Sequence, residues 1–325
     1  MDPSSSRRPT RADGARSIAP SSERPPLPPP AILVRVGAGI QVLGPLAIDG
    51  EPLAARRRER VLFAVLVLEA GQAVGLATLE DWLWPDGADG DHRRPVQVSL
   101  SRLRRVLREH DLDGELVSSG STYELRLPRG ATDADRVEDL LEQARSATLG
   151  RRLDLLDEAL RLWRGDVLAD LPELGVHPGV ARLQALYDVV LEEWADAALE
   201  AGQAQRVATR LDVLAVHELP SERSVGHLVL ALYRSGRPLD ALDRSTSYAR
   251  WLREERGLDP GPELQQLELG LLTHDGSLNG PLGPKDRGRA EIHEVRRRLL
   301  AELGDDGAVL GRERAAAEDA LRARS

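Results

Sequence analysis

Cysteine is absent from the 325-residue sequence, and its absence excludes several classes of protein. Without thiols the chain has no disulfide framework, no cysteine-ligated zinc and no thiolate nucleophile, so a stapled secreted scaffold and a zinc finger are both ruled out. Long hydrophobic runs are missing as well: the longest, residues 61–68, has eight residues, whereas a membrane-spanning helix needs about 20. We therefore expect a cytoplasmic protein with no membrane partner.

Lysine is almost absent too, because 43 of the 44 basic residues are arginine and Lys285 is the exception. The net charge of −9 argues at first against a nucleic-acid partner, but the acidity is concentrated in one segment. Residues 131–272 hold 16 basic and 26 acidic residues, whereas residues 31–130 hold 13 and 14. Inside the near-neutral segment lies a basic stripe without a carboxylate, which favours local contact with nucleic acid. It consists of Arg93, Arg94, Arg102, Arg104, Arg105 and Arg108.

The residue types of catalytic and metal sites lack the spacing that such sites need. The seven histidines are scattered, no phosphate-binding loop is present, and no serine lies in a nucleophile elbow. Adjacent acids such as Glu192 and Glu193 would point about 100° apart on a helix, which suits a solvated face better than an acid/base pair. We expect no enzyme activity, no metal ion and no cofactor.

Residues 1–30 contain eight prolines among serines and arginines. A segment of this composition buries too little apolar surface to become ordered, so it predicts a disordered leader. Ser6, Arg7 and Arg8 resemble part of a twin-arginine export signal, but no apolar stretch follows them. We expect no export.

Residues 31–130 begin with short strands and continue with helices. Apolar β-type residues at 32–36, 40–43 and 46–48, with a turn at Asp49 and Gly50, predict a small antiparallel sheet. Residues 55–70 place apolar side chains on one broad face, and a capping-box variant at Thr78 opens a shorter helix that ends at Trp84. The acidic residues at 86–91 lack the spacing of a calcium-binding EF-hand loop and are interpreted as a connector.

The third helix carries the clearest pattern. Pro95 suits a first helical turn, and Val96, Leu100, Leu103 and Leu107 share one face at 100° per residue, which leaves the other face to basic and polar residues. Alternating residues at 116–118 and 123–127 predict a β-hairpin after it. Strands, three helices and a terminal hairpin, in that order, predict a winged helix-turn-helix fold.

A winged helix reads DNA by placing the outer face of its third helix in the major groove. There Arg reaches guanine or phosphate, Gln reaches adenine, and an apolar group contacts the thymine methyl. A solvated basic face on an ordinary core helix is the alternative, and this helix alone does not separate the two. The predicted DNA-contacting residues are Arg93, Arg94, Gln97, Val98, Ser101, Arg102, Arg104, Arg105 and Arg108 in the helix, with Thr122 and Tyr123 in the hairpin.

Residues 131–272 are predicted to be helical almost throughout. Gly202 and Gly236 lie 34 residues apart, which is the tetratricopeptide period, and Val207 and Ala241 keep the same offset. The unit then loses register, so we predict an imperfect, α-solenoid-like domain. Residues 273–325 add two charged helical stretches, at about 290–303 and 312–323. The predicted breaks in the helical domain are Gly150, Gly165, Gly175, Gly202, Pro220, Gly236 and Pro260.

Several segments taken together resemble the SARP-type bacterial transcriptional activators, which join an OmpR-like winged helix to a tetratricopeptide-like bacterial transcriptional activator domain. In the first domain these segments are VLGPL at 42–46, Leu83 with Trp84, QVSLSRLRR at 97–105, and Tyr123 with Leu125. In the second they are ALRLWRG at 159–165, ALYRSGR at 231–237 and ERGLDPGPEL at 255–264. The resemblance spans about residues 38–272.

The resemblance implies a mainly α fold with a small β component and a set of partners. These are double-stranded promoter DNA bound at direct repeats, and RNA polymerase. We expect the acidic helical domain either to form a homodimer with a second copy of the chain or to dock other proteins. The resemblance further implies a nucleoid-associated activator of antibiotic and other secondary-metabolite gene clusters. Two segments depart from the family. AARRRER at 54–60 stands where a Gly-Pro-Lys-Gln-Arg type segment is usual, and Ser121-Thr122-Tyr123 replaces a Gly-Tyr pair.

We accordingly divide the chain into a leader (1–30), an OmpR-like winged-helix DNA-binding domain (31–130), a tetratricopeptide-like activator domain (131–272) and a C-terminal helical tail (273–325). The leading interpretation is a sequence-specific DNA-binding transcriptional activator that recruits RNA polymerase. The alternative is a protein-interaction module in which the helical domain does the work and the winged helix is degenerate.

Overall fold

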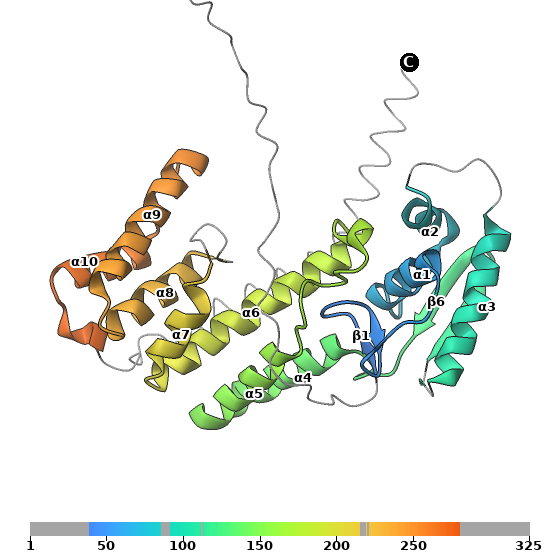
Figure 1. The fold of residues 1–325 in the computed structure, drawn as a ribbon, viewed down its shortest axis with the longest axis horizontal. Coiled ribbons are helices and arrows are strands. Elements are labelled where there is room, and N and C mark those ends of the chain that lie inside the picture. Colours follow the sequence, from blue (N-terminus) through green and yellow to red (C-terminus); the bar gives the residue numbers. More distant parts are fainter. Residues whose placement is uncertain are drawn as a thin grey trace, which may run out of the picture.

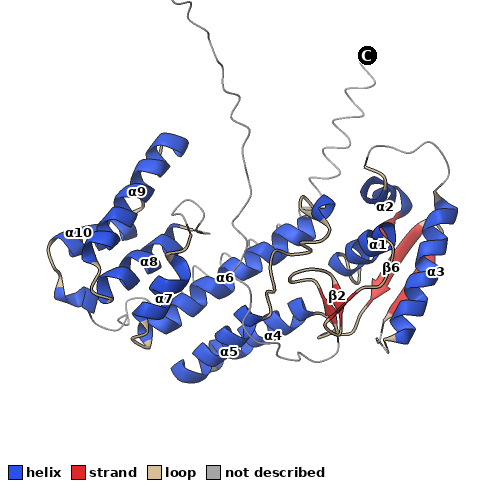
Figure 2. Cartoon of the chain, viewed as in Figure 1, coloured by secondary structure: helices blue, strands red, loops and turns tan. Residues whose placement is uncertain are grey.

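The structure, a computed structural model, describes residues 39–85, 92–110, 112, 114–214, 219 and 221–279. A small mixed part is followed along the chain by a larger helical part (Figure 1). Among the described residues, strands occur only in the first part (Figure 2). The mainly α architecture with a small β component confirms the predicted fold class.

A three-stranded antiparallel sheet opens the described chain, with its strands in the order β1-β2-β3. Asp49 and Gly50, at φ 55° and 86°, form the tight turn that the Asp-Gly sequence predicts. The third strand was not predicted, because its two residues are exposed and show no apolar alternation. The strands are β1 (Ile40–Gln41), β2 (Ala47–Ile48) and β3 (Glu51–Pro52).

The winged helix follows, built from three helices and a second three-stranded sheet in the order β4-β6-β5. Its third helix, α3, packs against α1 and is anchored through Val96, Leu100, Leu103 and Leu107, none of which is more than 3% exposed. The predicted buried face of this helix is therefore confirmed. The elements are α1 (Arg57–Leu68), β4 (Val74–Gly75), α2 (Leu76–Leu83), α3 (Arg93–Glu109), β5 (Glu115–Ser119) and β6 (Thr122–Arg126).

One local prediction in this part is wrong, and one strand was not predicted. The second helix begins at Leu76, with Gly75 as its N-cap residue, rather than at Thr78. Strand β4, directly before it, was missed because two residues are too few to show alternation. Only pairing with the distant β6, which sets Val74 opposite Tyr123, defines β4 as a strand.

The helical part is a succession of helices that pack on their neighbours along the chain. Gly202 and Gly236 adopt φ 73° and 77° at the turns after α6 and α8, so the predicted 34-residue offset marks two equivalent turns. Gly150 is not a break, since it lies inside α5. The helices are α4 (Asp133–Ser146), α5 (Leu149–Arg161), η1 (Pro172–Leu174), α6 (Pro178–Glu200), α7 (Ala204–Leu211), α8 (Glu222–Arg234), α9 (Pro238–Arg256), α10 (Pro262–Leu272) and η2 (Gly276–Asn279).

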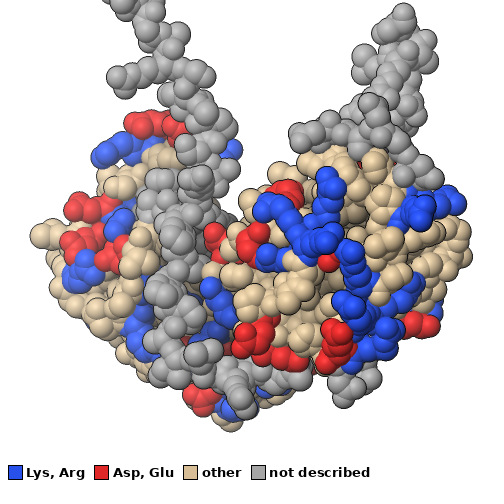
Figure 3. Space-filling model, turned by 45° about the vertical axis from the view of Figure 1, so that its right-hand side comes forward, with Lys and Arg blue, Asp and Glu red and all other residues tan. Residues whose placement is uncertain are grey.

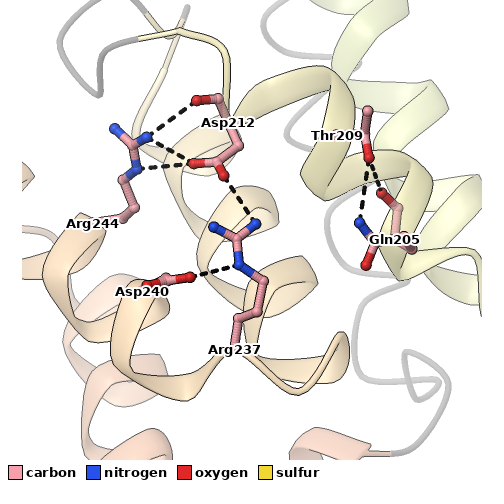
Figure 4. A network of polar contacts seen from close by, with 6 residues as sticks. All are labelled: Gln205, Thr209, Asp212, Arg237, Asp240 and Arg244. Carbon is pink, nitrogen blue, oxygen red and sulfur yellow. Dashed lines mark hydrogen bonds and ion pairs between the residues drawn. The ribbon is translucent and has the colours of Figure 1, made fainter.

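A polar network connects the C-terminal end of α7 to the first half of α9 (Figure 4). Asp212, just after α7, accepts hydrogen bonds from the guanidinium of Arg244 at 2.7 and 3.1 Å and pairs with Arg237 at 3.0 Å. Arg237 also donates to Asp240 at 2.5 Å. These partly exposed ion pairs fix one repeat against the next, a structural arrangement rather than a binding site.

The segment of residues 42–46 joins the winged helix to the helical part. The backbone N–H groups of Val42 and Leu43 donate to the carboxylate of Asp133 at 2.9 and 3.1 Å, and that of Leu46 donates to Asp170 at 2.8 Å. Buried backbone donors need such partners. Asp133, the first residue of α4, is 5% exposed, and burial raises the pKa of its carboxyl to about 6.

The loop between α5 and α6 donates hydrogen bonds to the carbonyl groups of the same segment. The N–H of Leu168 donates to the carbonyl of Val42 at 3.1 Å, and that of Arg164 donates to the carbonyl of Leu43 at 2.7 Å. Gly44 has φ 149°, and a Cβ added there would lie 2.9 Å from Cβ of Arg164. Only glycine fits between the two parts at this point.

A second junction joins the end of α1 to the start of α6, the long helix that runs through the middle of the molecule (Figure 1). A Cβ added at Gly179 would lie 2.9 Å from Cβ of Leu68. His177, the N-cap residue of α6, is 2% exposed, and its Nδ1 accepts from the N–H of Gly179 at 3.0 Å. Burial lowers the pKa of His177 to about 4, so its ring is neutral near pH 7.

Several predictions lie outside the described residues. They concern the leader at 1–30, the strand at 32–36, the acidic connector at 86–91, and the helical stretches at 290–303 and 312–323. In the part of the chain that the structure describes, no helix combines the length and apolar character needed to cross a membrane.

Candidate nucleic-acid interface

Helix α3 presents a basic face to solvent while its opposite face is fixed in the core. Figure 3 shows basic side chains gathered in a band on the half of the molecule that contains the winged helix. An anchored helix with outward basic side chains has the shape that a major groove accepts. Of the predicted residues on α3, Arg102 and Arg104 are partly buried, and Arg93, Arg94, Gln97, Val98, Ser101, Arg105 and Arg108 are exposed.

The middle of this face carries Arg94, Val98, Ser101 and Arg105, which lie on the side of α3 opposite the buried seam. Val98 is 46% exposed, unusual for a large apolar side chain and suited to a thymine methyl. Arg105 pairs with Glu109 at 3.4 Å, but both side chains are more than half exposed. Such a pair is weak in water, so a phosphate can replace Glu109.

Arg104, at one flank of the face, is bound to the wing, which is the hairpin of β5 and β6. Its guanidinium donates to the carbonyl of Leu116 at 3.0 and 3.3 Å and to Oγ of Ser118 at 2.8 Å. These bonds tie α3 to strand β5. Arg104 therefore sets the distance between helix and wing and has few donors left for DNA.

Arg102, at the opposite flank, is bound to α1. Its Nη1 contacts Oε1 of Glu59, whose other oxygen accepts the backbone N–H of Arg56 at 3.2 Å. Glu59 is 6% exposed, whereas the side chain of Arg102 is 41% exposed. Arg102 thus reaches solvent with one end of its guanidinium held by a buried carboxylate.

Of the two DNA contacts predicted in the wing, only Thr122 lies at the surface. Thr122 lies at the hairpin turn, where its hydroxyl donates to the carbonyl of Ser119 at 2.9 Å. Tyr123 is 2% exposed and belongs to the core, so its side chain does not reach a ligand at this surface. The prediction of Tyr123 as a direct contact is wrong because alternation along β6 turns its side chain inward.

The start of α1 adds basic residues that the sequence interpretation missed as contacts. Arg56 and Arg58 lie at the helix N-terminus beside the Arg102 flank, and the Arg58 guanidinium stacks 5.1 Å from the ring of Trp84. A helix N-terminus and two arginines attract phosphate. Arg57 differs, because it is paired with Glu173 at 2.6 Å. The run of three arginines was the available signal, but periodicity could not place it beside α3.

Fold and face together define a winged-helix protein with an appended tetratricopeptide-like domain. Among the described residues no group of histidines and acids is arranged to hold a metal ion. The model of the family described as "Bacterial transcriptional activator domain" matches residues 132–272.

Several known proteins are similar to this chain in sequence or in structure. Regulatory protein AfsR of Streptomyces coelicolor is 39% identical over 246 residues, which cover 73% of this chain and 24% of AfsR. Transcriptional regulator RedD of the same species is 33% identical over 258 residues, 74% of this chain and 72% of RedD. A solved structure, Mycobacterium tuberculosis EmbR in complex with a low affinity phosphopeptide, matches with TM-score 0.68 and 27% identity, covering 81% of this chain and 70% of the EmbR chain.

The chain belongs to the SARP family of bacterial transcriptional activators, as its sequence motifs predicted. It spans about a quarter of the length of AfsR.

Proposed function

We propose that the protein is a sequence-specific DNA-binding transcriptional activator that recruits RNA polymerase to promoters of secondary metabolism. The observation that carries the proposal is the geometry of α3. Its buried seam is intact, its outer face is basic, and its two flanks are bound to α1 and to the wing. Such a helix enters the major groove as one rigid unit.

The proposed contacts with DNA come from three places. The middle of α3 reads bases, and the exposed arginines Arg93, Arg94, Arg105 and Arg108 bind phosphates or guanine. The start of α1 and the hairpin turn at Thr122 contact the flanking backbone. Direct repeats in promoter DNA would be filled by adjacent copies, in keeping with a homodimer.

The proposed partner of the helical domain is protein rather than DNA. Residues 131–272 carry a net charge of −10, from 16 basic and 26 acidic residues, and would repel phosphates at long range. Stacked helices present grooves suited to protein surfaces. We assign DNA binding to residues 31–130 and contact with RNA polymerase to residues 131–272, with the chain acting at the nucleoid in the cytoplasm.

An interaction module with a degenerate winged helix is the competing function. A winged helix freed from DNA binding is under no demand to keep arginines on an outward face. Here exposed arginines lie on the outward face of α3, opposite a fully buried apolar seam, and this arrangement favours DNA binding.

Selection from randomised DNA tests the proposal. The full chain is incubated with duplexes that carry a randomised 30-base-pair centre, and bound duplexes are sequenced over successive rounds. We expect one motif to be enriched, and affinity for it to fall with salt by a slope of about −0.9 per phosphate neutralised. Absence of enrichment together with a slope near zero would contradict DNA binding and favour the interaction module.

A further inference from the structure

We propose that Glu59 is a positioning residue that sets the DNA sequence preference of this interface by restraining Arg102. The inference rests on the DNA-binding function proposed above. Glu59 does not face the ligand itself. Glu59 is only 6% exposed, and it lies in the first turn of α1, beneath the flank of α3.

Both oxygens of the Glu59 carboxylate are engaged in the free protein. One accepts the N–H of Arg56 at 3.2 Å and so caps α1, and the other contacts Nη1 of Arg102. The hydrogen bond from Arg56 therefore fixes the Glu59 carboxylate on α1, independently of its contact with Arg102. A fixed carboxylate restricts the side-chain rotamers of Arg102 in advance of DNA binding.

This restraint separates Arg102 from three exposed arginines of α3, which are Arg94, Arg105 and Arg108. Arg105 is paired only with the exposed Glu109 at 3.4 Å, with its own side chain 68% exposed. Within the described residues, neither Arg94 nor Arg108 is paired with a carboxylate. These three side chains can change rotamer to reach a phosphate in many positions. Arg102, by contrast, keeps its remaining N–H groups in one direction.

Direction matters more for bases than for phosphates. A guanine edge requires two N–H groups aimed together at O6 and N7, while a phosphate accepts an arginine from many angles. The buried negative charge of Glu59 also lowers the attraction of Arg102 for a general phosphate. The Glu59–Arg102 pair therefore strengthens binding to the correct DNA sequence and adds little affinity for other sequences. This raises the ratio of specific to non-specific affinity.

Glu59→Gln in the full chain tests the proposal. Glutamine has the same shape and keeps an oxygen to cap α1, but it releases Arg102 from a charged partner. Affinities are measured for the selected motif and for a duplex of scrambled sequence at several salt concentrations. We expect binding to the scrambled duplex to strengthen, with a salt slope steeper by about 0.9, and discrimination between the duplexes to fall about fivefold or more.

Two companion variants complete the design. Glu158→Gln removes the same charge from α5, where Glu158 pairs with Arg136 at 2.7 Å, and should leave discrimination unchanged. Arg102→Ala should lose discrimination by itself, and Glu59→Gln added to it should cause no further loss. A Glu59 effect that persists without Arg102 would overturn the proposal.

Two other outcomes are equally decisive. If Glu59→Gln weakens both duplexes equally and in step with a lower melting temperature, Glu59 is only a helix cap and the proposal is wrong. If Arg102→Ala and Arg105→Ala each leave every affinity unchanged, the DNA-binding function itself fails.

Discussion

At the scale of single residues, neighbours on α3 have opposite physical roles. Leu103 is 1% exposed in the core, while Arg102 and Arg104 beside it reach out to α1 and the wing. We expect Leu103→Ala to lower the free energy of unfolding by about 2–5 kcal/mol, because it removes buried apolar atoms and leaves a cavity. Urea denaturation measures the change. Val98→Ala, at a position 46% exposed, is the matched control and should stay within about 0.5 kcal/mol; equal losses would mean that the faces are reversed.

Arg105 tests the outer face in the same way. Arg105→Ala should weaken binding to the selected motif and reduce the magnitude of the salt slope by about 0.9, since one phosphate contact is lost. The melting temperature should stay at the wild-type value, because the side chain is exposed and its pair with Glu109 is weak. Arg151→Ala on α5 removes an exposed arginine far from α3 and should change neither quantity. An unaltered affinity for Arg105→Ala would remove this residue from the interface.

At the scale of elements, periodicity predicted what each helix buries but not what its flanks touch. The four apolar residues of α3 follow from the 100° step between residues, and all four are buried. The partners of Arg102 and Arg104 lie 43 and 12 to 14 residues away, and no local pattern encodes such distances. Tyr123 was misplaced for a related reason. Which face of β6 points inward depends on its pairing with β4, a strand too short to recognise.

The junction of α1 and α6 makes the stability of the protein depend on pH. Burial lowers the pKa of His177 from 6.5 to about 4, so between pH 4 and pH 6.5 the unfolded chain binds a proton that the folded chain does not. The contribution of this histidine is complete above pH 6.5 and is lost as pH falls toward 4. A shift of this size corresponds to about 3 kcal/mol.

His177→Asn tests this effect, since asparagine keeps an N-cap acceptor for Gly179 but does not titrate. We expect the free energy of unfolding to fall more steeply between pH 7 and pH 4 in the wild type than in the variant. Denaturant titrations at each pH unit measure the two curves. Asp133, whose raised pKa acts in the opposite sense, is present in both proteins and cancels in the comparison. Parallel curves would show that the pKa of His177 is the same in the folded and the unfolded chain.

At the scale of the whole molecule, the two parts are held as one body by backbone hydrogen bonds. Residues 42–46, read from sequence as part of a sheet, connect through Asp133 and Asp170 and through the loop between α5 and α6. None of these groups belongs to α3 or to the wing. The face proposed to bind DNA is therefore separate from the joint that fixes the helical domain relative to it, and a change at the joint should affect activation more than DNA binding.

Gly44→Ala makes that change without touching the proposed DNA contacts. The added Cβ would lie 2.9 Å from Cβ of Arg164 at φ 149°, so the segment and the loop must move apart. We expect affinity for the selected motif to stay within about threefold, a change of under 1 kcal/mol, and transcription to drop sharply in an assay with purified bacterial RNA polymerase. Gly50→Ala is the matched control, because Gly50 also has a positive φ, 86°, but has no atom within 4 Å of an added Cβ. The Gly50→Ala variant has only the cost of backbone strain, of order 1 kcal/mol, and should activate transcription normally. Full activation by Gly44→Ala would show that activation does not require this joint, and equal losses in both variants would trace the effect to strain in the N-terminal sheet.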